Sequence, residues 1–204
     1  MKRYSRFDLL NNAIVGSTGQ VINRIFESKE VKLTISVPEY DLKRASVFVG
    51  TINELIEDEV DELFTIEDLI VLLYKDLLRQ IDIGMNLDTF ARAIESKLND
   101  FEKTNVKVHH YLKNLEENIS LDEIRQQMKQ KKQVQNQEVY FSFRILKKYV
   151  LKGEVLLHDL NELYPKIHLN VEELIALRFK DIMREIKAGD YKILANIIQT
   201  LTNS

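Results

Sequence analysis

The sequence predicts a mostly α-helical, bundle-like protein with one short β-strand or hairpin near residues 31–37. Along most of the 204 residues, apolar side chains recur every three or four positions, as on the buried side of an amphipathic helix. Only six glycines and two prolines are present, whereas sandwiches and barrels need many turn residues. Residues 31–37 instead alternate apolar and polar side chains, which is typical of a half-buried strand.

The strand follows a predicted N-terminal helical region and needs a partner. Ser5 and Asp8 have the spacing of a helix start. A lone strand leaves its edges unpaired, so a second strand is expected. Within the chain, residues 105–109 are the one other candidate strand, and a strand from a second subunit is the alternative.

A long helix is predicted next, because residues 42–60 carry a helical apolar stripe that includes Leu55. Pro38 suits the first turn of a helix, with Ser36 as a candidate cap. Inside a helix, Gly50 costs about 1 kcal/mol relative to alanine, so we expect close packing or a kink at this position.

Capping residues mark the later helix boundaries. Thr65 with Asp68 and Asn170 with Glu173 have the spacing of helix starts. Helical apolar spacing resumes at Val139 and continues through Phe143, Leu146 and Val150. We expect helices to end at or near these residues: Gly84, Gly153, Tyr164 and Gly189.

The composition shifts most clearly at residues 126–137, where glutamine and lysine replace the apolar pattern. Such a stretch is a solvated helix extension or a linker between domains. The predicted organisation is therefore an N-terminal, mostly helical region (1–125) with the strand, the polar segment (126–137), and a C-terminal helical region (138–204).

Charge is strongly polarised along the chain, although the formal net charge is only -3. Between Ala45 and Tyr74 there are eight acids and no lysine or arginine, whereas residues 129–152 contain seven basic residues and one acid. These opposed acidic (54–68) and basic (129–152) surfaces supply the candidate partner-binding residues, which are Glu54, Glu57, Asp58, Asp61, Glu62, Lys129, Lys131, Lys132, Lys147 and Lys148.

Site motifs are missing from the sequence. The absence of cysteine excludes disulfides and thiolate metal sites. The pair His109-His110 is adjacent and so points in two directions, and the loop 16–19 lacks the lysine and third glycine of phosphate-binding loops. No nucleophile motif is visible. We therefore expect no catalytic residue, no cofactor and no metal.

The leading functional prediction is a non-catalytic interaction or assembly protein whose partner is another protein or a second copy of itself. The alternative is a nucleic-acid-associated regulator using residues 129–152, although the isoelectric point of about 5.9 is low for such a domain. A third hypothesis is an enzyme with a dispersed site. No apolar run approaches the roughly 20 residues of a membrane span, and no signal peptide is evident, so a cytoplasmic location without membrane contact is expected.

Overall fold

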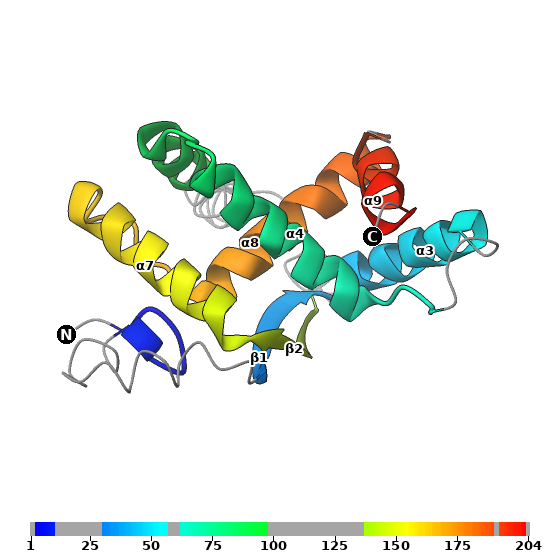
Figure 1. Ribbon diagram of the computed structural model, residues 1–204, viewed down its shortest axis with the longest axis horizontal. Coiled ribbons are helices and arrows are strands. Elements are labelled where there is room, and N and C mark those ends of the chain that lie inside the picture. Colours follow the sequence, from blue (N-terminus) through cyan, green and yellow to red (C-terminus); the bar gives the residue numbers. More distant parts are fainter. Residues whose placement is uncertain (1–2, 11–29, 57–61, 98–136, 190–191, 203–204) are drawn as a thin grey trace, which may run out of the picture.

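The computed structural model describes residues 3–10, 30–56, 62–97, 137–189 and 192–202 (Figure 1). Among these residues, two strands and five long helices follow one another. They are β1 (Glu30–Pro38), α3 (Glu39–Ile56), α4 (Ile66–Asp82), β2 (Glu138–Leu146), α7 (Lys147–Leu163), α8 (Val171–Lys187) and α9 (Lys192–Thr202). A further helical segment covers residues 87–97. The fold is thus mostly α with one small antiparallel sheet, as predicted.

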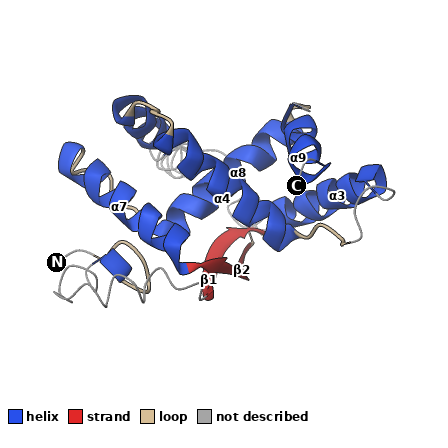
Figure 2. Cartoon of the chain, in the orientation of Figure 1, coloured by secondary structure: helices blue, strands red, loops and turns tan. Residues whose placement is uncertain are grey.

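The two strands lie on one side of the helices (Figure 2) and pair antiparallel along their whole length, with Glu30 opposite Leu146 and Pro38 opposite Glu138. The apolar residues of β1 alternate into the core, and these are Val31, Leu33, Ile35 and Val37. The predicted strand 31–37 is confirmed, and its partner is a second segment of the same chain. The other candidate strand, 105–109, lies outside the described residues.

The helix predicted from Val139 is wrong, because residues 138–146 form β2. Phe143 and Ile145 are buried while Arg144 between them is exposed, which is the alternation of a strand. The proposed helix cap at Ser36 is also wrong. This residue lies within β1, and its hydroxyl donates to the Glu138 carboxylate across the sheet.

The predicted helix starts at Thr65 and Asn170 are confirmed. Each side chain accepts a hydrogen bond from the third residue of its helix, and Asp68 or Glu173 closes the capping box in return. Gly84 and Gly189 follow α4 and α8 with positive φ angles of 99° and 83°, which favour glycine.

Gly153 does not end a helix, as the sequence suggested, but lies inside the continuous helix α7. An added Cβ atom would lie 1.9 Å from the hydroxyl oxygen of Tyr74 on α4, so only glycine permits this approach of the two helices. The expected close packing at Gly50 is wrong, because nothing lies within 4 Å of a Cβ added there.

Helix α8 is central to the packing and contacts β1, α3, α4 and α7. Its buried residues include Leu174, Ile175 and Phe179, which join one hydrophobic cluster with the inner face of the sheet. Described parts of both predicted regions, 1–125 and 138–204, contribute to this cluster. Apart from Gln137, the segment 126–137 lies outside the described residues, and the division of the chain there stays a prediction.

The N-terminal segment is attached to α7 by the buried carboxylate of Glu154. This carboxylate accepts hydrogen bonds from the Ser5 hydroxyl and from the backbone N–H groups of Leu9 and Leu10. Helical structure begins at Leu9 and not directly after Ser5, since Asp8 has a φ angle of 50°. A distant carboxylate therefore satisfies the free N–H groups at this helix start.

Burial raises the pKa of Glu154, while the three hydrogen bonds oppose that rise. The neighbouring Tyr74 is fully buried, and burial together with the carboxylates of Glu154 and Glu172 raises the pKa of its phenol. The Tyr74 hydroxyl donates to the carbonyl oxygen of Tyr149 at 3.2 Å. This phenol is therefore a neutral structural group at physiological pH.

Candidate functional site

The structure describes four of the ten candidate partner-binding residues. Glu54, Glu62 and Lys148 are exposed, and Lys147 is half-buried. None of the ion pairs between described residues joins the acidic group to the basic group. The other six candidates, Glu57, Asp58, Asp61, Lys129, Lys131 and Lys132, lie outside the described residues.

Helix α3 carries large apolar side chains on its solvent side. Tyr40, Val47 and Leu55 are 62, 72 and 57 % exposed. With 3.6 residues per turn they share one stripe, together with Arg44 and Thr51. We call these five residues the outer α3 surface. The sequence had placed Leu55 in the core, and the structure corrects this.

The adjoining side of α3 packs in the core. Its buried residues are Ala45, Phe48, Val49, Ile52 and Ile56. Apolar residues therefore lie both on the buried side of α3 and on its exposed stripe. Rotating the helix about its axis would not bury both sets at once. Figure 1 shows α3 at one end of the molecule, beside α9.

Negative charge accumulates at the C-terminal end of the outer α3 surface. At the other end, Lys43 pairs with Glu39 and Arg44 pairs with Asp41, both at 2.7 Å. The last turn of α3 contains no basic residue, and Glu54 is unfavourably placed near the negative end of the helix dipole.

The segment after α3 adds to this end of the surface. The side-chain amide of Asn53 donates to the carbonyl oxygen of Phe64 and accepts from its N–H, both at 2.9 Å. Glu62 and the 78 % exposed Leu63 are thereby held near the last turns of α3. The result is an apolar surface with an acidic end.

The outer face of the sheet carries charges of both signs, because Glu30 and Glu138 are exposed there beside two basic residues. Lys32 and Arg144 are directly opposite each other and both exposed, an arrangement that is destabilising for like charges. Tyr140 is exposed on the same face. Lys147 and Lys148 follow at the start of α7, whose first turn has no acid to match the positive end of the helix dipole. The start of α7 therefore attracts anions.

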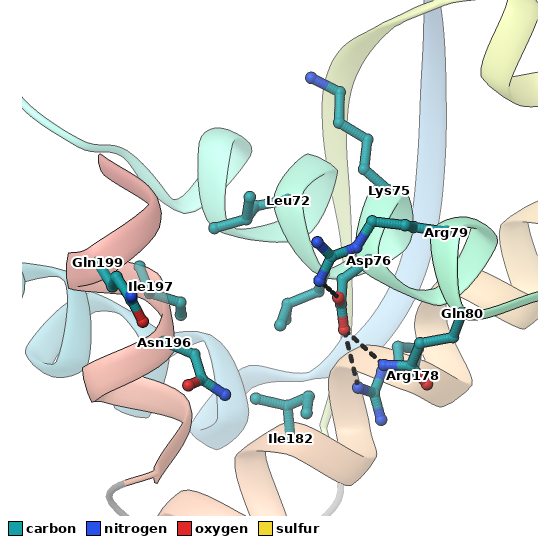
Figure 3. A pocket seen from close by; sticks show the side chains of 11 residues that line it. Leu72, Lys75, Asp76, Arg79, Gln80, Arg178, Ile182, Asn196, Ile197 and Gln199 are labelled. Atoms are coloured by element: carbon teal, nitrogen blue, oxygen red, sulfur yellow. Dashed lines mark hydrogen bonds and ion pairs between the residues drawn. The ribbon is translucent and has the colours of Figure 1, made fainter. Parts of the chain in front are cut away.

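A cleft of about 760 Å³ lies between α4, α8 and α9 (Figure 3). Its polar lining residues include Lys75, Asp76, Arg79 and Arg178, so three cations and one carboxylate give a formal charge of +2. The apolar lining residues are Leu72, Leu73, Ile182 and Ile197. The sequence pointed to none of them as a site, because they come from three separate helices without a local motif.

Asp76 organises the charged side of this cleft. Its carboxylate accepts hydrogen bonds from Arg79 at 3.0 Å and from the Gln80 amide at 2.7 Å, and it lies 3.9 Å from the Arg178 guanidinium. Figure 3 shows Asp76 between the two arginines, with Asn196 and Gln199 of α9 across the cleft.

The histidines and acids of the described residues were candidates for a metal site. No group of three or more histidine or acidic side chains there could hold a metal ion. His158 packs edge-on against Tyr4 and lies 3.5 Å from Asp159. The pair His109-His110 and the loop 16–19 fall outside the described residues.

No described helix is both long enough and apolar enough to cross a membrane. Comparison of the chain with protein-family models, with curated proteins and with solved structures finds no match.

Proposed function

We propose that this protein is a non-catalytic interaction or assembly protein that binds its partner through the outer α3 surface. The observation that carries this proposal is the exposure of Tyr40, Val47 and Leu55 along one side of a helix whose other side is already buried. Exposed apolar side chains that line up on one side of a helix suit an interaction site. An amphipathic helix face of this type fits a groove on a partner.

The partner has an apolar groove with a basic rim. Apolar contact supplies most of the affinity, whereas the charges at Glu54 and Glu62 guide approach and orientation. A second copy of the chain offers matching charges in Arg144, Lys147 and Lys148. Self-association is therefore the first form of the proposal to test.

Sedimentation of the full chain over a range of protein and salt concentrations measures self-association. We expect an oligomer that the double variant Val47→Glu, Leu55→Glu weakens by about 100-fold, because it adds charge to an apolar contact near existing acids. The matched control is Val155→Glu, Leu163→Glu, which makes the same change at two exposed positions of α7. It should leave the oligomer unchanged.

If the partner is another protein, the same variants identify it by affinity capture. A partner that binds at the outer α3 surface is lost with Val47→Glu, Leu55→Glu and kept with the α7 control. Two results together would contradict the proposal. The chain would be a monomer at every concentration, and no captured protein would be lost with Val47→Glu, Leu55→Glu.

A second candidate function is nucleic-acid binding by the outer face of the sheet. The facing Lys32 and Arg144, with the exposed Tyr140, favour it, because phosphates neutralise such cations and bases stack on aromatic rings. The double variant Arg144→Glu, Lys148→Glu should then weaken binding of a single-stranded DNA or RNA and reduce its salt dependence.

The control for that measurement is Lys166→Glu, Lys187→Glu, which changes two exposed lysines elsewhere. Equal binding by both double variants, or no binding at low salt, would end this second candidate.

A further inference from the structure

We infer that the cleft between α4, α8 and α9 binds a small organic anion with a phosphate or carboxylate group and an apolar or aromatic body. The cleft volume of about 760 Å³ lies within the range of small-molecule sites. The site is separate from the outer α3 surface, and either can exist without the other.

Arg178 gives the strongest indication of an anion site. Its side chain is 23 % exposed, and its Nε atom is buried. Its ion-pair distance to Asp76 is 3.9 Å, which is too long for a hydrogen bond, and its Nε atom has no hydrogen-bond partner among the described residues. A buried N–H group normally has a hydrogen-bond partner, so Arg178 has bonding capacity that Asp76 does not use.

Asp76 alone does not balance the charge here. One carboxylate faces Arg79 and Arg178, and it is already shared with the Gln80 amide. The Lys75 ammonium lies over the Tyr149 ring and does not take part. The role of Asp76 is to position the two guanidinium groups, which come from α4 and α8. Two oriented guanidinium groups with surplus positive charge suit the paired oxygens of a phosphate or carboxylate.

The rest of the cleft defines the body of the ligand. Ile182 and Ile197 are nearly fully buried, and with Leu72 they form an apolar lining beside the arginines. Figure 3 shows these three side chains directed toward the space between the helices. Inorganic phosphate would use only the charged side, whereas an anion with an apolar body would fill both parts.

Calorimetry with phenyl phosphate, benzoate, inorganic phosphate and benzyl alcohol separates these contributions. We expect phenyl phosphate or benzoate to bind the full chain more tightly than inorganic phosphate, and the neutral alcohol to bind at least about tenfold more weakly than the anions. Methyl NMR signals of Leu72, Ile182 and Ile197 should shift on binding, which places the ligand in the cleft.

The test variant is Arg178→Gln, and its matched control on the same helix is Arg184→Gln, a residue outside the cleft lining. We expect Arg178→Gln to weaken binding at least about tenfold and Arg184→Gln to leave it unchanged. Arg79→Gln provides a second test if Arg178→Gln fails to fold. No binding of either aromatic anion at about 5 mM, or equal binding by the cleft and control variants, would overturn the inference.

Discussion

Replacing Gly153 by alanine should destabilise the protein, although alanine is the better helix former. The substitution alone favours the helix by about 1 kcal/mol. Against this, the new Cβ would lie 1.9 Å from the Tyr74 hydroxyl oxygen and 3.1 Å from a methyl carbon of Val171. Forcing an extra carbon into a packed core costs about 1–3 kcal/mol, and displacing the Tyr74 hydroxyl removes its hydrogen bond to Tyr149, which costs about 1 kcal/mol. We expect a net loss of about 2 kcal/mol.

A double-mutant cycle with Tyr74→Phe tests the cause. Tyr74→Phe alone should cost about 1 kcal/mol for the lost hydrogen bond. In the phenylalanine background the nearest oxygen is gone, so Gly153→Ala should become close to neutral. The two substitutions should therefore couple favourably by about 2 kcal/mol.

Urea unfolding monitored by circular dichroism measures these free energies, and Gly50→Ala is the matched control. An added Cβ at Gly50 meets nothing within 4 Å, so alanine there should raise the free energy of unfolding by up to about 1 kcal/mol. The packing argument is refuted if Gly153→Ala stabilises the protein as Gly50→Ala does, or if the coupling with Tyr74→Phe is absent.

Three further predictions concern hydrogen bonds that attach segments to the core. Glu154→Ala leaves the Ser5 hydroxyl and the N–H groups of Leu9 and Leu10 without their acceptor and should lower the free energy of unfolding by about 3 kcal/mol; denaturant unfolding checks this, and an unchanged free energy of unfolding would contradict the assignment. Because the folded-state pKa of Glu154 is raised above 4.5, its contribution is fully present below that pH and is lost as the pH rises through the folded pKa. The stability of the wild type relative to Glu154→Gln should therefore fall with rising pH, and a flat or rising difference would be evidence against a raised pKa. Asn53→Ala removes both bonds to Phe64 and should cost about 2 kcal/mol and speed proteolysis at residues 62–65; unchanged cleavage would show that Asn53 does not hold the segment.

Local signals in the sequence were sufficient for much of the helical fold. The helix capping boxes at Thr65 and Asn170 were predictable, because the residues that form the hydrogen bonds of each box lie within four positions of one another in the sequence. The strand 31–37 was predictable because its alternation is regular.

Contacts between distant residues account for the errors. The apolar residues of β2 fit a helical spacing, and its pairing joins residues far apart in sequence, as in the hydrogen bond between Thr34 and Ser142. The alternation of Phe141, Phe143 and Ile145 with polar residues was the one available signal. Gly153 resembled a helix end because the sequence does not show the side chain that requires a glycine there. That side chain is Tyr74, which lies on another helix.

The candidate sites were even less predictable. Charge counting located Glu54 and Lys148 on the surface, but it could not show that Val47 and Leu55 are exposed, since apolar residues on both sides of α3 fit the same periodicity. The cleft at Asp76 and Arg178 depends on the packing of three helices, which no local pattern specifies.

Site-specific cross-linking from α3 tests the proposed function most directly. The chain contains no cysteine, so Val47→Cys provides a unique position for a photoreactive maleimide label, and Val155→Cys on α7 is the control. We predict a cross-link from position 47 to a second copy or to a specific partner, reduced by Leu55→Glu, and none from position 155. Absence of a cross-link at position 47, or equal cross-linking from both positions, would contradict binding through the outer α3 surface.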